Sequence, residues 1–365
     1  MSDLTAALTA GRVGRLTCAC PPAEATAPAD ASDVRRLTAG FALSAIAQSL
    51  SLTLLPLAGG KLAPTHALAG APFALTLLGA ALASIPASLL IDIFGRRAAF
   101  ALGASLGTAG GLLGAAAIVK GDFTLLCLAG LWIGVAQGFA LFYRHAAAAA
   151  GGEGRDALTV LSGALAAGFV APAIVFFCQV QAGPLVDAAL AVAAGLTSFA
   201  ALPILLTLPH DIRPRAPAHV APLRDRRFWF AGAAGVASWF FMAWVMTRAP
   251  MALAGCGLGA GLIGAFVSWH VVAMVAPIGV GARWNVATGI ALPVGLALLT
   301  VALVGGRGGA LSLEAGLIMA GLGWSFIQVA VARFLAAAAP SRLALGLHDC
   351  AILTAALAGA LVGGT

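Results

Sequence analysis

Eleven apolar segments of about twenty residues each dominate the sequence and constrain its fold more than any other feature. They lie near residues 37–59, 68–91, 98–119, 123–146, 157–179, 184–207, 228–249, 258–281, 285–305, 311–336 and 343–364. About 20 apolar residues span the hydrocarbon core of a bilayer once, and within lipid a helix satisfies its own backbone hydrogen bonds. The sequence therefore predicts an all-α polytopic membrane protein with about eleven or twelve transmembrane helices, in which the lipid bilayer is a partner.

Composition excludes the other broad classes. Hydrophobic residues make up 61% of the chain and charged residues only 9%, whereas a soluble protein carries about 25% charged residues. The formal net charge of +7 does not indicate a nucleic-acid partner. Neither a nucleophile–base pair nor a phosphate-binding loop with its lysine is visible, so we expect no enzyme and no prosthetic group.

The distribution of positive charge predicts the topology. With the N-terminus in the cytoplasm, sixteen of the twenty Lys and Arg residues fall on the cytoplasmic side or at cytoplasmic helix ends, as the positive-inside rule requires. The four exceptions are Lys61, Lys120, Arg248 and Arg307.

One long polar connection divides the chain. Residues 208–227 carry five arginines and four prolines, typical of a cytoplasmic linker between two helical bundles. We expect a disordered cytoplasmic tail over 1–35, a six-helix bundle over 36–207 and a C-terminal bundle of five clear spans over 228–365. Two bundles joined by such a linker suit a transporter whose halves rock against each other. The competing interpretation is that residues 208–227 are an ordinary long loop with no such role.

A short motif between the second and third spans sharpens this interpretation. The segment Ser88-Leu-Leu-Ile-Asp92-Ile-Phe-Gly95-Arg96-Arg97 resembles the signature loop of the major facilitator superfamily, with Ser88 in place of its leading glycine and Ile93 in place of its first basic residue. The resemblance implies two helical bundles that alternate in access. We expect Asp92, Gly95, Arg96, Arg97 and Arg144 to form a conformational latch, in which Asp92 pairs with Arg144.

Soft metal ligands gather in one window of the C-terminal half. Met242 and Met246 are four residues apart, as are His270 and Met274, so each pair shares one helix face. The side chains of this window favour Cu(I), and intramembrane histidine is rare and usually functional. The candidate copper ligands are Met242, Met246, Met251, Cys256, His270 and Met274. Methionines that merely fill the core are the competing interpretation.

A second resemblance decides the substrate expectation. The segments from Phe241 to Thr247 and from Trp269 to Pro277 resemble the CcoA-type branch of the superfamily, as do, more loosely, Gln137–Arg144 and Gly321–Phe326. Members of that branch import copper for haem–copper cytochrome oxidase assembly, and their hallmark matches Met242/Met246 and His270/Met274. Close relatives that lack these pairs are proposed to carry organic solutes such as riboflavin.

The resemblance implies a copper importer of the bacterial cytoplasmic (inner) membrane, with copper as transported substrate and a cytoplasmic copper chaperone or an oxidase assembly factor as partner. A facilitator for a riboflavin-like solute and a non-transporting assembly factor are the alternatives. Helix rise places Met242 and His270 next to each other near the midplane. His348 and Asp349, inside the last span, are candidates for proton coupling, and the alternative is that Asp349 acts as a cap or pairs with a neighbouring arginine. Cys18 and Cys20 in the tail could receive copper, or be chance cysteines.

Overall fold

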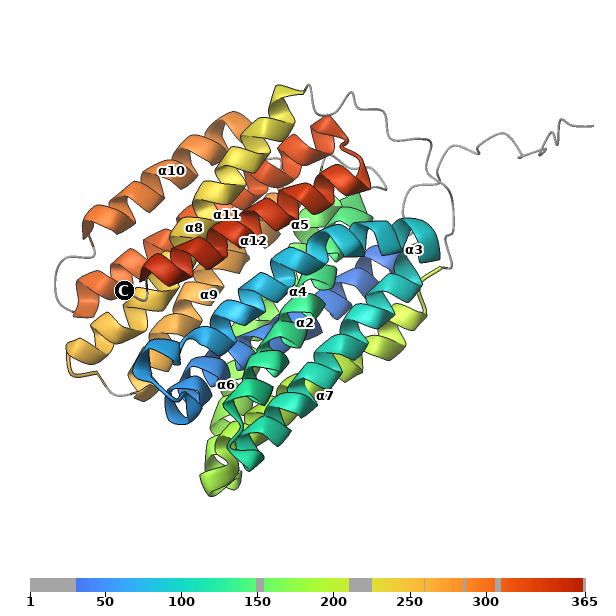
Figure 1. The fold of residues 1–365 in the computed structure, drawn as a ribbon. Helices are drawn as coiled ribbons and strands as arrows, with labels where there is room; N and C mark the ends of the chain where they lie inside the picture. Colours follow the sequence, from blue (N-terminus) through green and yellow to red (C-terminus); the bar gives the residue numbers. More distant parts are fainter. Residues whose placement is uncertain are drawn as a thin grey trace, which may run out of the picture.

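The computed structural model describes residues 31–148, 154–209, 225–258, 260–284, 287–305 and 310–363, and over this part every regular element is helical (Figure 1). The α-helices are α2 (Ala31–Leu62), α3 (Ala71–Lys120), α4 (Phe123–Ala148), α5 (Arg155–Ser162), α6 (Leu165–Gln181), α7 (Val186–Leu206), α8 (Arg226–Gly255), α9 (Ala260–Arg283), α10 (Thr288–Gly305), α11 (Ala310–Ala338) and α12 (Arg342–Gly363). Two short 3₁₀ helices, η1 (His66–Leu68) and η2 (Gly183–Leu185), join α2 to α3 and α6 to α7.

Helix α3 contains two of the expected spans. Its 50 residues would rise about 75 Å as one straight helix, far beyond a bilayer core of about 30 Å. Figure 1 shows the chain reversing direction within α3. The reversal lies at Gly95, whose φ of 80° is a left-handed conformation that glycine adopts without a Cβ clash. The second and third predicted spans are thus the two arms of α3.

The other predicted spans each match helices of the described chain. The span expected at 157–179 consists of α5 and α6 together, and α10 is a short apolar helix of 18 residues. Helix α2 begins at Ala31, earlier than the span predicted from 37. Residues 1–30, with Cys18 and Cys20, and most of the 208–227 linker lie outside the described residues, so the domain boundaries stay a prediction.

The helices pack into two groups that follow chain order. Helices α2 to α7 form an N-terminal bundle, in which α3 packs on α4 and α7, and helices α8 to α12 form a C-terminal bundle, in which α8 packs on α12 and α11. Glycines permit the closest approaches: a Cβ on Gly134 of α4 would lie 1.9 Å from the carbonyl oxygen of Thr76. Gly103, Gly107 and Gly111 recur every four residues on the second arm of α3 and also serve packing, since a Cβ on Gly111 would lie 2.4 Å from the backbone nitrogen of Gly195 of α7.

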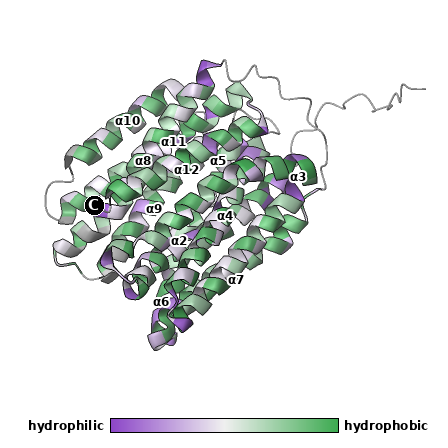
Figure 2. Cartoon of the chain, viewed as in Figure 1, coloured by the Kyte–Doolittle hydropathy of each residue, from purple (hydrophilic) through white to green (hydrophobic). Residues whose placement is uncertain are grey.

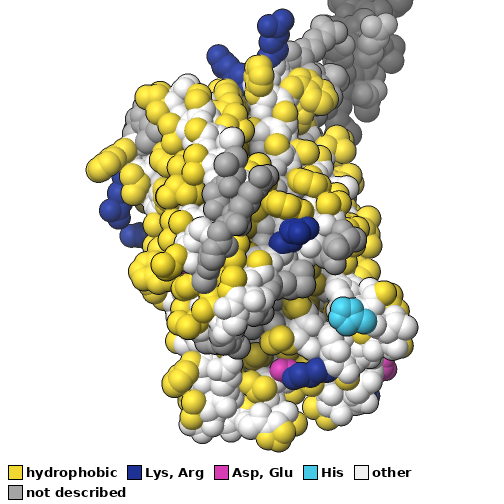
Figure 3. All heavy atoms as spheres, turned by 90° about the vertical axis from the view of Figure 1, so that its left-hand side faces the viewer, with side chains coloured by type: hydrophobic (Ala, Val, Ile, Leu, Met, Phe, Trp, Pro, Cys, Tyr) yellow, Lys and Arg dark blue, Asp and Glu magenta, His cyan; other side chains and the backbone are white. Residues whose placement is uncertain are grey.

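Hydrophobic residues predominate along the helices (Figure 2). Figure 3 shows hydrophobic side chains over much of the C-terminal bundle and few charged ones. Trp229 and Phe230 of α8 and Ile290 of α10 are among the exposed large side chains. Nine helical segments of the described chain are long and apolar enough to cross a membrane, with α3 counted once. Such a surface suits contact with lipid tails.

The two bundles meet chiefly along three helix pairs. The first arm of α3 packs on α12, and α5 and α6 pack on α9. We call the end of the protein where α2 and α12 begin the arginine-rich end, because it carries Arg36, Arg96 and Arg342. At this end a Cβ on Gly346 of α12 would lie 3.0 Å from the carbonyl oxygen of Ser84. This is the end predicted to be cytoplasmic. The bundles are in close contact there.

Candidate functional site

A charged cluster joins the two bundles inside the protein. It consists of Arg144 and His145 of α4 and His348 and Asp349 of α12, all of them buried. The Arg144 Nη2 group donates to Asp349 Oδ1 at 2.6 Å, His145 Nε2 donates to Asp349 Oδ2 at 3.0 Å, and His348 Nδ1 donates to Asp349 Oδ1 at 3.0 Å. One carboxylate therefore accepts three hydrogen bonds, two of which cross between the bundles.

The residues of the predicted latch form other ion pairs than the one expected. Asp92 pairs with Arg342 at the first turn of α12, and Arg144 pairs with Asp349, so the expected Asp92–Arg144 pair was wrong. Depth explains the difference. Arg144 is 4% exposed, whereas the Asp92 side chain is 43% exposed at the surface. The sequence did not reveal that α12 supplies both partners, Arg342 for Asp92 at the surface and Asp349 for Arg144 in the interior.

The other latch residues serve the N-terminal bundle. Gly95 makes the turn of α3, and Arg96 pairs with Asp33 at the start of α2, which also binds Arg36 at 3.1 Å. Arg97 is exposed. The charged residues of the loop motif thus tie α2 to the turn of α3, and among them Asp92 forms an ion pair with the other bundle in the described part of the chain.

The candidate copper ligands lie partly together. His270 of α9 and Met242 of α8 are both buried, and the His270 Nε2 atom lies 3.2 Å from the Met242 Sδ atom, so the two are neighbours as helix geometry predicts. The opposite ring nitrogen, Nδ1, lies 2.6 Å from the Leu317 carbonyl oxygen. If Nδ1–H donates there, Nε2 keeps its lone pair toward the sulfur, and a backbone acceptor of this kind commonly orients a metal-binding histidine.

The remaining soft ligands are less closely placed. Met246 and Met274 pack against the same apolar cluster that contains Met242. Cys256 is exposed beyond the end of α8, and the side chain of Met251 lies outside the description. Among the described residues no group of three or more His, Cys, Asp or Glu side chains is placed to hold a metal ion. The role of all six residues as ligands stays a prediction.

An aromatic group that the sequence analysis missed lies where the bundles meet. Trp239 of α8 and Trp324 of α11 pack edge to face with ring centroids 5.6 Å apart. Both contact apolar clusters that also contain Phe41 of α2. Neither indole nitrogen, although buried, has a hydrogen-bond partner among the described residues. Two unsatisfied donors inside a protein are unusual and call for a ligand or a water.

Buried polar groups lie on the same two helices, α8 and α11. The Gln328 amide of α11 donates to the Ser238 hydroxyl of α8 at 3.2 Å, and both side chains are buried. The Ser325 hydroxyl is buried without a partner among the described residues. A signal was present in the sequence: Gln328 interrupts an apolar run one helical turn after Trp324. Intramembrane polar residues of this kind mark substrate pathways.

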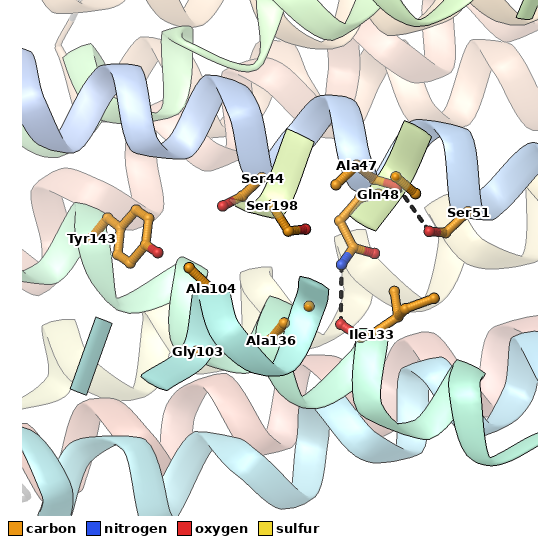
Figure 4. A pocket seen from close by; sticks show the side chains of 12 residues that line it. Ser44, Ala47, Gln48, Ser51, Gly103, Ala104, Ile133, Ala136, Tyr143 and Ser198 are labelled. Atoms are coloured by element: carbon orange, nitrogen blue, oxygen red, sulfur yellow. Dashed lines mark hydrogen bonds between the residues drawn. The ribbon is translucent and has the colours of Figure 1, made fainter. Parts of the chain in front are cut away.

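A small cavity inside the N-terminal bundle is a separate feature (Figure 4). It has a volume of about 20 Å³ and lies between α2, α3, α4 and α7. Ser44, Gln48, Ser51, Tyr143 and Ser198 give it a polar lining, and Gln48 donates to the Ile133 carbonyl oxygen at 3.2 Å. That volume suits about one water molecule. It is therefore too small for an organic solute.

The comparisons with known proteins agree on the fold. No protein-family model matches the chain. Solved structures that it resembles include the human organic anion transporter MFSD10 (TETRAN), with a TM-score of 0.62 and 17% identity over 91% of this chain and 92% of the other. They also include the E. coli fucose:proton symporter FucP, with a TM-score of 0.62 and 16% identity over 91% of this chain and 88% of the other.

A bacterial homologue of the iron transporter ferroportin, in its outward-facing state, matches with a TM-score of 0.61 and 13% identity over 91% of this chain and 97% of the other. The chain is thus a polytopic membrane protein with the transporter fold of the major facilitator superfamily. The predicted fold class is confirmed.

Sequence similarity adds a curated relative. The chain is 35% identical to the riboflavin transporter RfnT of Brucella anthropi over 263 residues, 68% of this chain and 66% of that protein. The relative and the structures above are transporters, in line with the expectation that the chain is not an enzyme. The curated relative is a riboflavin transporter and not a copper importer, so it favours the alternative of a facilitator for a riboflavin-like solute.

Proposed function

We propose that the chain is a secondary-type transporter of a small organic solute with a flat heteroaromatic ring of the riboflavin kind. The similarity to RfnT supports this substrate class. The observation that carries the proposal to particular residues is the pair of buried, unpartnered indole N–H groups on Trp239 and Trp324.

The chemistry of this group suits such a ring. Indole faces stack on heteroaromatic rings, and indole N–H groups donate to ring carbonyl oxygens and nitrogens. The Gln328 amide and the Ser238 hydroxyl are further donors and acceptors on the same two helices. Trp324 is only 7% exposed, so a solute reaches it when the bundles separate. Binding at the junction of two bundles is typical of transporters with this architecture.

Binding of riboflavin to the detergent-solubilised protein tests the proposal through quenching of flavin fluorescence. Trp324→Phe and Trp239→Phe keep an aromatic ring and remove the N–H donor. A net hydrogen bond contributes about 0.5–1.5 kcal/mol, so each change should weaken binding about three- to tenfold. The matched control is Trp229→Phe, because Trp229 lies on α8 but is 61% exposed on the apolar surface.

The control should bind like the wild type. Equal riboflavin affinity of all four proteins would contradict the site, and the absence of saturable riboflavin binding to the wild type would contradict the substrate class.

Copper import is the second candidate, and one observation favours it. The His270 Nε2 atom and the Met242 Sδ atom lie 3.2 Å apart and buried, an arrangement in which an imidazole and a thioether face one point and suit Cu(I). His270→Leu and Met242→Leu keep bulk while they remove the ligand atoms. If copper is the cargo, both variants lose uptake of radioactive copper at normal protein levels. The control Met319→Leu, which changes a methionine of α11 outside the six candidate ligands, keeps it. Wild-type copper uptake by both variants would end this alternative.

A further inference from the structure

We propose that the charged cluster of Arg144, His145, His348 and Asp349 is a proton-binding site, at which proton uptake releases the two bundles from each other at the arginine-rich end. The inference rests on the proposed function, since only a transporter needs this release. It names a proton as the second substrate and Asp349 as the group that takes it.

The charge balance of the closed cluster carries the argument. One guanidinium faces one carboxylate at 2.6 Å, so the cluster is electrically neutral when both imidazoles are neutral. Each imidazole already donates one N–H to Asp349. A proton added to the closed cluster would leave an unbalanced positive charge among side chains that are at most 8% exposed. Burying such a charge is strongly unfavourable.

Separation of the bundles reverses this preference. Arg144 and His145 belong to α4, and Asp349 and His348 belong to α12, so separation takes the guanidinium away from the carboxylate. An unpaired carboxylate in the protein interior is costly, and protonation removes that cost. A new O–H bond then forms on Asp349, and the hydrogen bond from Arg144 is lost. The separated state holds more protons than the closed state, so acid favours separation.

The described residues that other helices pack around His348 and Asp349 carry no further titratable group. Phe228 and Gly235 of helix α8 lie against His348, and the ring centroids of Phe228 and His348 are 6.5 Å apart. Helix α3 presents Ser84 and Ser88 to Gly346, one turn before Asp349. None of these four residues carries a group that titrates near neutral pH, so the titratable and charged groups that face Asp349 in the described part of the chain are those of the cluster.

One atom of the cluster is placed to receive the incoming proton. The His348 Nε2 atom is buried and has no hydrogen-bond partner among the described residues. Because Nδ1–H donates to Asp349, Nε2 carries a free lone pair. A proton that arrives at Nε2 lets Nδ1 pass its own proton to Asp349 Oδ1, so that no net charge remains on the imidazole. His348 is therefore a positioning residue for proton delivery to Asp349.

The test needs no solute, which separates it from the test of the proposed function. Nitroxide labels are placed at Leu206 at the end of α7 and at Leu343 in the first turn of α12, both exposed, in a background without the native cysteines. Pulsed electron resonance then gives the distance distribution between bundles at about pH 8 and at about pH 5, a range in which histidine and perturbed carboxyl groups titrate.

In the wild type the ratio of separated to closed protein should rise at least about tenfold between about pH 8 and about pH 5. Uptake of one proton can shift a two-state ratio by up to about tenfold for each pH unit, so a rise of this size lies within the limit. Asp349→Asn should hold a ratio that changes less than about twofold over the same range. The matched control is Asp92→Asn, which removes the other carboxylate that pairs with α12; it should keep the tenfold response from a different starting ratio.

An unchanged ratio in the wild type, or a wild-type response in Asp349→Asn, would overturn the proposal. Should Asp349→Asn fail to fold, His348→Gln carries the test, with a weakened response expected and an unaltered one contradicting the proposal. Riboflavin binding at the tryptophans can succeed or fail independently of either result.

Discussion

Two Asp–Arg pairs connect α12 to the N-terminal bundle, and they differ chiefly in depth. Asp92 and Arg342 form one pair with side chains 43% and 27% exposed, and Arg144 and Asp349 form the other with side chains 4% and 0% exposed. The first pair is screened by water and salt, which leaves a surface pair worth about 0–1 kcal/mol. The second pair is shielded, so loss of one partner leaves a buried charge.

The difference assigns separate tasks to the two pairs. The surface pair helps to bring the bundle ends together but cannot hold them strongly. The buried pair makes closure of the bundles depend on the charge state of one carboxylate, that of Asp349. This carboxylate accepts hydrogen bonds from Arg144 and from both histidines of the cluster. The predictions below test this division, from the largest expected effect to the smallest.

Replacement of Asp349 by Ala should lower stability by about 3–5 kcal/mol, because Arg144 is left buried without its carboxylate. The measurement is the midpoint of thermal unfolding in detergent. The double variant Arg144→Met, Asp349→Leu removes both charges at similar volume and should recover most of the loss, since an apolar replacement of a buried pair is often neutral. A double variant as unstable as the single one would show that the pair is not the cause.

Gly346 lies between the two pairs and sets the distance of α12 from α3. A Cβ there would lie 3.0 Å from the Ser84 carbonyl oxygen and 2.9 Å from the Ser88 hydroxyl. Gly346→Ala should therefore cost about 1–3 kcal/mol through strain. Gly232→Ala on α8, where a Cβ meets nothing within 4 Å, is the matched control and should be neutral or slightly stabilising. Equal unfolding midpoints for the two variants would refute the close approach.

Replacement of Asp92 by Asn should have the smallest effect, at most about 1 kcal/mol, and the effect should shrink as salt is added. Unfolding midpoints at low and high ionic strength measure it. A loss as large as that of Asp349→Ala would erase the distinction between the two pairs.

The fold was predictable from the sequence because the physics of lipid leaves few choices. Apolar length fixed the spans, and Gly95 with its arginines marked the turn that α3 makes. The exceptions were local. Helix α2 includes residues 31–36, before the predicted span, and there Asp33 pairs with Arg36 and Arg96, a pairing that is not visible in a hydropathy pattern.

The candidate site was predictable only where helix rise sets the relative depth of residues on two consecutive helices. Spacing placed Met242 next to His270, and the structure has them 3.2 Å apart. Pairing between distant helices was not predictable: Arg144 lies 205 residues from Asp349, and either Asp92 or Asp349 could have been its partner. Trp239 and Trp324 were missed because an apolar ring in an apolar helix gives no signal, and only the structure reveals that their N–H groups lack partners.

Uptake by proteoliposomes tests the central claim most directly, with riboflavin and radioactive copper offered to the same wild-type protein, to Trp324→Phe and to His270→Leu. An organic-solute transporter should accumulate riboflavin in the wild type and lose several-fold of that rate in Trp324→Phe. Copper uptake should stay at the level of protein-free vesicles throughout. Copper accumulation that His270→Leu abolishes, with no riboflavin uptake by the wild type, would contradict the account and make the Met242–His270 pair the substrate site.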